Sequence, residues 1–210
     1  SKKLRGPIVD PLLGYDENSP VYELDLEKAE EHFKQAWDGQ VWEKGFKMTI
    51  LYNSGNMTRK TAADIFKSYL EQLNPKFDID TRAVQWSTFL DESARGTLPL
   101  QIGGWLADFP DPHNFVQPFL HSQGYYGAKR GENYQEWAKE NVDPLIDEGI
   151  SELDRSERED IYKELQSIAH EQAIDVWIDQ PTGARIQRTW VKGWYPNPMR
   201  PGQYFYILDK

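Results

Sequence analysis

The chain has no cysteine among its 210 residues and no long apolar run. The lack of cysteine excludes disulfides, thiolate catalysis and zinc sites built from thiolates. No window approaches the roughly 18 apolar residues that a membrane-spanning helix needs. No apolar stretch follows Ser1, Lys2 and Lys3 either, so the pattern of a signal peptide is missing.

Basic residues are also scarce, because 24 Lys and Arg stand against 34 Asp and Glu, giving a net charge of −10. Phosphate neutralisation needs clustered Lys and Arg, so we expect no nucleic-acid partner. The chain lacks a Gly-x-Ser-x-Gly elbow, a His-Glu-x-x-His pair and a phosphate-cradling glycine loop. A glycosidase-like pair of carboxylates stays open, although nothing singles out two of them. We therefore expect no enzyme, no catalytic residue and no cofactor.

What the chain does have is a strand–helix–strand–helix–strand order in its first half, which predicts an α/β fold with a layered sheet and crossover helices. Apolar residues make up 39%, enough for a core, and eight tryptophans raise the aromatic share to 13%. The five elements follow from alternating and helical apolar periods. They cover Phe46–Tyr52, Thr58–Leu73, Phe77–Val84, Ser87–Ala94 and Leu98–Gly103.

Further elements are expected on either side of this core. Asp25 caps a helix whose apolar face includes Trp37 and which ends at Gly39. A capping box of Ser156 and Glu159 starts a later helix. Segments 1–22 and 194–210 show no regular period. The remaining expected elements are helices at 114–120, 134–153 (interrupted at Pro144 and Gly149) and 156–172, and strands at 174–178 and 185–191.

The run from Gly103 to Phe115 is the strongest candidate for a binding site. Two glycines allow close approach at a strand end, and prolines stiffen the loop that presents Trp105 and Asp108. Trp86 directly follows the preceding strand. Because ligands of such sheets bind beyond the carboxyl ends of strands, Trp86, Trp105 and Asp108 are predicted to bind a cationic or amphipathic small molecule.

The same run invites a metal hypothesis through His113, which lies near Asp108 and Asp111. The spacing Asp-x-x-Asp-x-His on a proline-rich loop is not a standard ligand arrangement, so no metal site is predicted. Asp111 precedes Pro112 and is predicted to be a turn or cap residue.

Four segments together resemble the family 5 solute-binding proteins of ABC importers, which bind peptides, nickel or oligosaccharides. The run Gly103–Phe115 is similar to the family signature. Tyr22–Ala29 resembles its Y-x-x-D-x-x-K-A helix start, and Val84–Leu90 its V-x-W-x-x-F/Y-L segment. Asp154–Tyr162 resembles its D-x-x-E-R-x-x-x-Y helix start. These segments match the C-terminal lobe of the family, and the N-terminal lobe has no counterpart in this chain.

The resemblance implies one ligand-binding lobe over residues 1–210, of the periplasmic-binding-protein-like type II, with a mixed sheet flanked by helices. Residues 1–22 would lead into the lobe and 194–210 would return to the missing N-terminal lobe. Trp86 and Trp105 would line the pocket, and Asp108 would pair with a peptide's α-amino group. The whole protein would be extracytoplasmic and membrane-anchored, would close on its ligand and would dock on an ABC permease. The isolated lobe would bind ligand weakly.

Two positions depart from the oligopeptide-binding pattern. That pattern has a basic residue at two positions where this chain has Ile102 and Ser93 instead. Pairing of a peptide carboxylate from these positions is therefore not expected. This leaves an oligosaccharide ligand, or a peptide whose carboxylate is held elsewhere, as open alternatives. A sensor or interaction module without a transport role is a further alternative.

Overall fold

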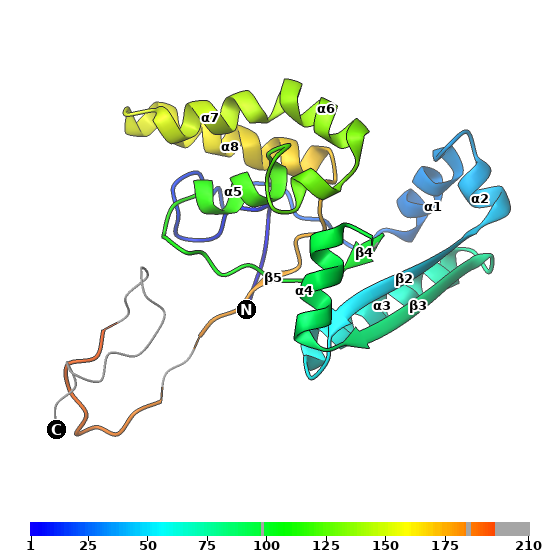
Figure 1. The fold of residues 1–210 in the computed structure, drawn as a ribbon, viewed down its shortest axis with the longest axis horizontal. Helices are drawn as coiled ribbons and strands as arrows, with labels where there is room; N and C mark the ends of the chain where they lie inside the picture. Colours follow the sequence, from blue (N-terminus) through cyan, green and yellow to red (C-terminus); the bar gives the residue numbers. More distant parts are fainter. Residues whose placement is uncertain (98, 184–185, 196–210) are drawn as a thin grey trace. The chain divides into compact units, whose positions relative to one another are not determined.

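The structure is a computed structural model that describes residues 1–97, 99–183 and 186–195. Backbone contacts divide the chain into two units (Figure 1). The sheet unit is Glu23–Trp105. The helical unit joins Ser1–Tyr22 to the described residues from Leu106 onward. Each unit has its own buried core, and the expectation of a single lobe stays a prediction.

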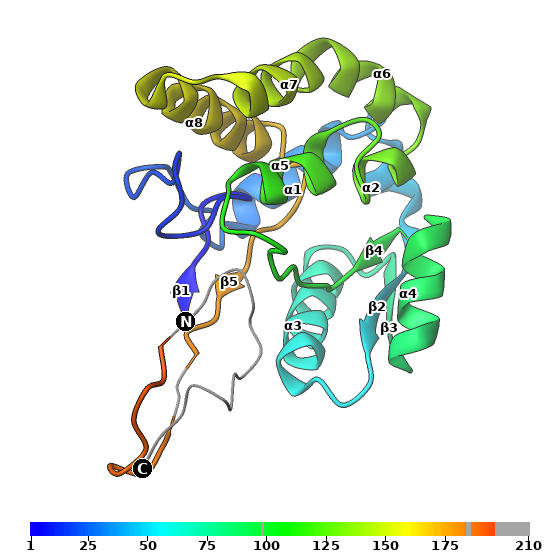
Figure 2. The ribbon, with the colours of Figure 1, turned by 60° about the vertical axis from the view of Figure 1, so that its left-hand side comes forward.

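The sheet unit is built on three parallel strands in the order β3-β2-β4. The central strand β2 (Phe46–Asn53) pairs with β3 (Phe77–Val84) over its full length, from Phe46 opposite Phe77 to Asn53 opposite Val84. It pairs with the short β4 (Leu100–Gln101) on its other edge. The chain crosses from β2 to β3 in one direction and from β3 back past β2 to β4 in the other. As a result, α3 (Met57–Leu73) and α4 (Trp86–Arg95) cover opposite faces (Figure 2).

The core of the sheet unit lies on the face of the sheet that α3 covers. Two short helices, α1 (Leu26–Gln35) and α2 (Gln40–Lys44), add Phe33, Val41 and Trp42 to its edge. As predicted, Asp25 caps α1 by accepting a hydrogen bond from the Lys28 amide. The buried members of this core are Ile50, Tyr52, Ala63, Phe77, Ile79 and Ile102.

The prediction that Trp37 belongs to the buried face of the first helix is wrong. The helix ends at Gln35, and Trp37 and Asp38 follow it with left-handed backbone angles, φ 49° and 54°. This turn directs the Trp37 side chain outward, where it is 81% exposed.

The helical unit packs its helices around Tyr162, Ile146, Leu165 and Leu120, with Ile8 from the N-terminal segment. Residues 1–22 therefore contribute to a core, and β1 (Lys2–Lys3) pairs antiparallel with β5 (Asp179–Gln180). The helices are α5 (His113–Leu120), the 3-10 helix η1 (Gly127–Lys129), α6 (Glu132–Asn141), α7 (Asp143–Ser151) and α8 (Arg155–Glu171).

Several predicted boundaries of the helical unit need correction. The expected helix 134–153 is two helices that meet at Val142, and Pro144 is accommodated in the first turn of α7. Asp154 caps α8 by accepting from the Ser156 and Glu157 amides, so the predicted capping box is wrong.

The expected strands near the C-terminus also differ from the structure. Residues 174–178 form no strand, and the pairing falls on β5. Residues 186–191 form no strand, while Arg185 and 196–210 lie outside the described residues. Within the described part of the chain, no helix combines the length and apolar character needed to cross a lipid bilayer.

Candidate functional site

The carboxyl edge of the sheet gathers polar and aromatic residues from three chain segments. Asn53 ends β2, Trp86 begins α4 two residues after β3 ends, and Gly104 follows β4. Because all three strands are parallel, these positions share one edge within the sheet unit. This placement agrees with the prediction from the strand order.

A cation-aromatic cluster occupies this edge. Arg59, in the first turn of α3, donates from Nη1 to Asn53 Oδ1 at 2.7 Å. Its guanidinium carbon lies 5.9 Å from the ring centroids of both Trp86 and Phe89, which stack on each other at 5.4 Å. Trp86 is half exposed to solvent.

Gly104 makes room for the guanidinium. A Cβ placed on Gly104 would stand 2.8 Å from Arg59 Nη2, closer than real carbon atoms come. Trp105 follows it and is partly buried. We did not identify Arg59 from the sequence, although its place just after a strand's carboxyl end follows the same rule that singled out Trp86.

Asp108 belongs to the helical unit and its side chain is exposed, not buried. Its backbone amide donates to Asn114 Oδ1 at 3.0 Å, which ties the loop to the first turn of α5. The structure therefore brings Trp86 together with Arg59 and Gly104, and it places Asp108 in the other unit. A joint site of Trp86, Trp105 and Asp108 stays a prediction.

Asp111 has the structural role predicted for it, together with an unpredicted partner. Its Oδ1 accepts from the His113 amide at 2.9 Å, as a capping residue does. Its carboxylate also accepts from Arg158 Nη2. This hydrogen bond raises the pKa of Arg158 above its ordinary value.

The metal hypothesis at His113 depends on its acidic neighbours, Asp108 and Asp111. No group of three His, Asp or Glu side chains suited to a metal ion occurs among the described residues. The buried His113 Nδ1 has no hydrogen-bond partner among the described residues. Burial lowers the pKa of His113 from its ordinary value, so its neutral form is favoured.

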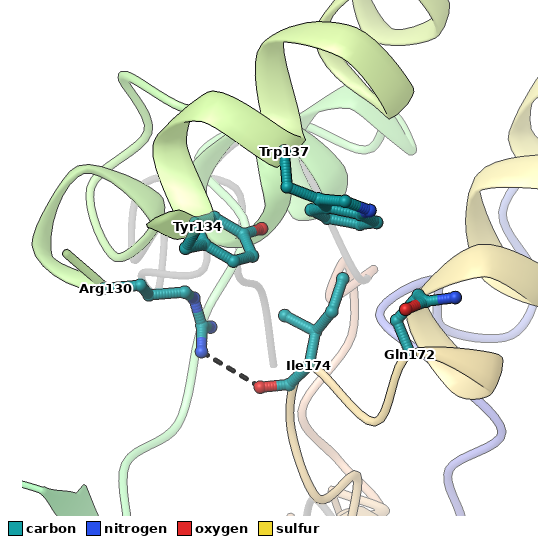
Figure 3. Close-up of a pocket in the computed structure, with 5 residues that line it drawn as sticks. All are labelled: Arg130, Tyr134, Trp137, Gln172 and Ile174. Carbon is teal, nitrogen blue, oxygen red and sulfur yellow. Dashed lines mark hydrogen bonds between the residues drawn. The ribbon is translucent and has the colours of Figure 1, made fainter. Parts of the chain in front are cut away.

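A small cavity of about 180 Å³ lies elsewhere in the helical unit (Figure 3). Tyr134 and Trp137 of α6 face Ile174 across it, and Gln172 and Arg130 complete its lining. Arg130 is already engaged, because it donates to the Ile174 carbonyl at 2.9 Å and to Asp175 at 2.6 Å.

The tyrosine in this cavity is held as a neutral phenol. Tyr134 donates its hydroxyl hydrogen to the Leu120 carbonyl at 2.7 Å, and burial raises its pKa to about 12. Arg130 is paired with Asp175 and the Tyr134 hydroxyl is bonded to a carbonyl. The cavity therefore offers less for recognition of a charged ligand than the carboxyl edge of the sheet does.

A parallel α/β sheet with aromatic and cationic groups beyond its strand ends is typical of ligand-binding proteins, and solved structures have the same fold. The chain is similar to a Helicobacter pylori ABC transporter-associated periplasmic binding protein, DppA, solved with the peptide STSA. The TM-score is 0.68 at 26% identity, covering 82% of this chain and 32% of that one. The fold is therefore that of a periplasmic binding protein, and the predicted α/β class with a helix-flanked sheet is confirmed.

The family model for bacterial extracellular solute-binding proteins, family 5 (Middle), matches residues 1–127, and the chain belongs to this family. It is 27% identical over 198 residues to di/tripeptide-binding protein 4 of Pseudomonas aeruginosa, covering 92% of this chain and 35% of that protein. It is 28% identical over 200 residues to the probable D,D-dipeptide-binding periplasmic protein DdpA of Escherichia coli, covering 94% and 36%. The chain thus spans about a third of the length of these relatives.

Proposed function

We propose that this chain supplies part of the ligand-binding surface of a peptide-binding protein that delivers peptides to an ABC permease. The observation that carries the proposal is the cluster of Arg59, Trp86 and Gly104 at the carboxyl edge of the sheet. Two relatives that match over nine-tenths of this chain are named for binding dipeptides or tripeptides, which supports the ligand class.

A peptide carries an ammonium and a carboxylate, so its site needs an anion and a cation. In this proposal Asp108 pairs with the α-amino group and Trp86 and Trp105 cover the peptide's side chains. Arg59 takes the carboxylate. In this assignment, Arg59 of α3 supplies the cation that the buried, uncharged Ile102 and Ser93 do not provide.

Peptide binding in this proposal couples to closure of the whole protein, because a ligand favours the form that contacts it from two sides. The protein acts outside the cytoplasm, is anchored to the membrane and presents its closed form to the permease. Its role is binding without catalysis. The comparisons lend no support to the oligosaccharide alternative.

The test measures binding of trialanine and N-acetyl-trialanine by calorimetry in the natural protein that contains this sequence. Asp108→Asn should weaken trialanine at least tenfold and leave the acetylated peptide unchanged, because only the free peptide has an ammonium. Asp160→Asn is the matched control, since Asp160 is an exposed aspartate of the same unit. Equal affinity of wild type and Asp108→Asn for trialanine would contradict the proposed role of Asp108.

A further inference from the structure

Arg158 joins two sequence segments that are separated by 47 positions. Its Nη2 donates to both carboxylate oxygens of Asp111, at 2.9 and 3.0 Å. Its Nε donates to the Gly149 carbonyl at 2.7 Å. One guanidinium thereby holds the loop before α5 against α7 and α8, and both side chains of the ion pair are largely buried, with 19% and 29% exposed.

The hydrogen bonds continue from Asp111 to the loop residue Asp108. The Asp111 carbonyl accepts from the Asn114 amide at 3.1 Å, and its carboxylate accepts from the His113 amide. Asn114 is buried, and its side-chain oxygen accepts from the Asp108 amide at 3.0 Å. Arg158 is therefore connected to the backbone of Asp108 through an unbroken series of polar contacts within one unit.

We infer that Arg158 is a positioning residue for ligand binding: it holds the loop that carries Asp108 in its binding conformation without touching the ligand. The inference rests on the proposed function. Ordering a loop before the ligand arrives removes an entropic cost from binding. Without this anchor the loop samples other conformations, and each encounter with a peptide ammonium includes the cost of ordering it.

Arginine is needed here because two different nitrogens of its planar fork act together on two acceptors. Lysine has a single ammonium on a flexible stem, so Arg158→Lys keeps the charge but not the paired geometry. A purely structural role also has support, because the guanidinium lies 5.0 Å from the ring of the core residue Tyr162. Peptide selectivity separates the two roles.

Arg130 provides a closely matched control in the same unit. It too donates to one backbone carbonyl, of Ile174, and to one carboxylate, of Asp175. The side chains of this pair are exposed to a similar degree, 23% and 29%. Arg130→Lys therefore reports the general cost of weakening such a pair in the helical unit.

The first experiment compares trialanine with N-acetyl-trialanine in the natural protein carrying Arg158→Lys, Arg158→Gln or Arg130→Lys. The Arg158 variants should bind trialanine about tenfold more weakly and the acetylated peptide as the wild type does. Arg130→Lys should leave the ratio of the two affinities unchanged. Equal losses for both peptides in the Arg158 variants would assign Arg158 a structural role and overturn the inference.

A double-mutant cycle with Asp108→Asn separates this inference from the function on which it depends. If Arg158 acts through Asp108, Arg158→Lys should cost no further trialanine affinity once Asp108 is Asn. A loss in Asp108→Asn alone, with none in the Arg158 variants, overturns only the inference. No loss in Asp108→Asn contradicts the proposed function itself.

Hydrogen exchange of the ligand-free protein gives a readout that needs no peptide. Arg158→Lys should speed exchange at the Asp108, His113 and Asn114 amides, while Arg130→Lys should not. Asp111→Asn, which removes the other partner, should give the same pattern as Arg158→Lys. Unchanged exchange at these amides in both variants would contradict the proposed connection.

Discussion

Gly104 leaves the space that the Arg59 guanidinium occupies, since a Cβ on Gly104 would stand 2.8 Å from Nη2. The guanidinium is the mobile end of a long side chain, so it would move while the backbone stays in place. Gly104→Ala should therefore change the stability of the chain little and weaken peptide binding severalfold. Calorimetry with trialanine and thermal unfolding of the same sample check the two halves of this prediction. A large loss of stability with unchanged affinity would contradict it.

Arg59 should distinguish peptides by their C-terminal group. In Arg59→Gln, affinity for trialanine should fall at least tenfold, because a charge-assisted hydrogen bond to the carboxylate is lost. Affinity for trialanine amide, which lacks that charge, should change little. Arg82→Gln is a suitable control, because Arg82 pairs with Glu92 in the same unit. If both peptides lose affinity equally, Arg59 acts on the position of Trp86 and not on the carboxylate.

Gly14 should tolerate no side chain. Its φ is +79°, and a Cβ there would lie 2.4 Å from Tyr162 Cβ in the core of the helical unit. Strain and overpacking together predict that Gly14→Ala lowers the free energy of unfolding by about 2–4 kcal/mol. Gly55→Ala is the matched control, because Gly55 has φ +81° but open space around it. It should cost only about 1 kcal/mol, and urea unfolding of the chain would measure both.

His113 should make the helical unit less stable in mild acid. Burial lowers its pKa below the ordinary 6.5, with Arg158 and His121 acting in the same direction and Asp111 and Asp147 opposing. The folded state then binds fewer protons than the unfolded state between the two pKa values. The stability contributed by the neutral, buried His113 is complete above pH 6.5. It is lost as the pH falls through the lowered pKa of the folded state.

Urea unfolding between pH 7.5 and 5 would measure this dependence. His113→Gln should flatten the part of the profile just below pH 6.5. His32→Gln, on the exposed surface of α1, should leave it unchanged. A profile that His113→Gln does not alter would show that other groups dominate.

The sheet unit could be predicted closely because its elements have strong, local periodicity. The strand Phe77–Val84 has the predicted bounds, and the helix predicted at Thr58–Leu73 begins one residue earlier, at Met57. The prediction failed at Trp37, where apolar spacing alone could not reveal that the helix ends at Gln35 and turns into left-handed backbone.

The binding site itself stays a prediction, and the structure tests only where its candidate residues lie. The strand order predicts that Trp86 lies at the carboxyl edge of the sheet, and it does. The roles proposed for Arg59 and Arg158 could not be predicted, because both depend on partners far away in the sequence. Asp154 and Ser156 both suit a helix cap, and only the backbone geometry decides between them.

The parallel direction of the three strands has an electrostatic consequence. Because α3 and α4 each follow the carboxyl end of a parallel strand, their first turns lie at the same edge of the sheet, and the positive ends of two helix dipoles point there beside Arg59. In a chain whose net charge is −10, these dipole ends and Arg59 favour a negatively charged group at this edge. A zwitterionic ligand approaching it would be oriented with its negative end inward before any contact forms, and added salt would weaken that orientation.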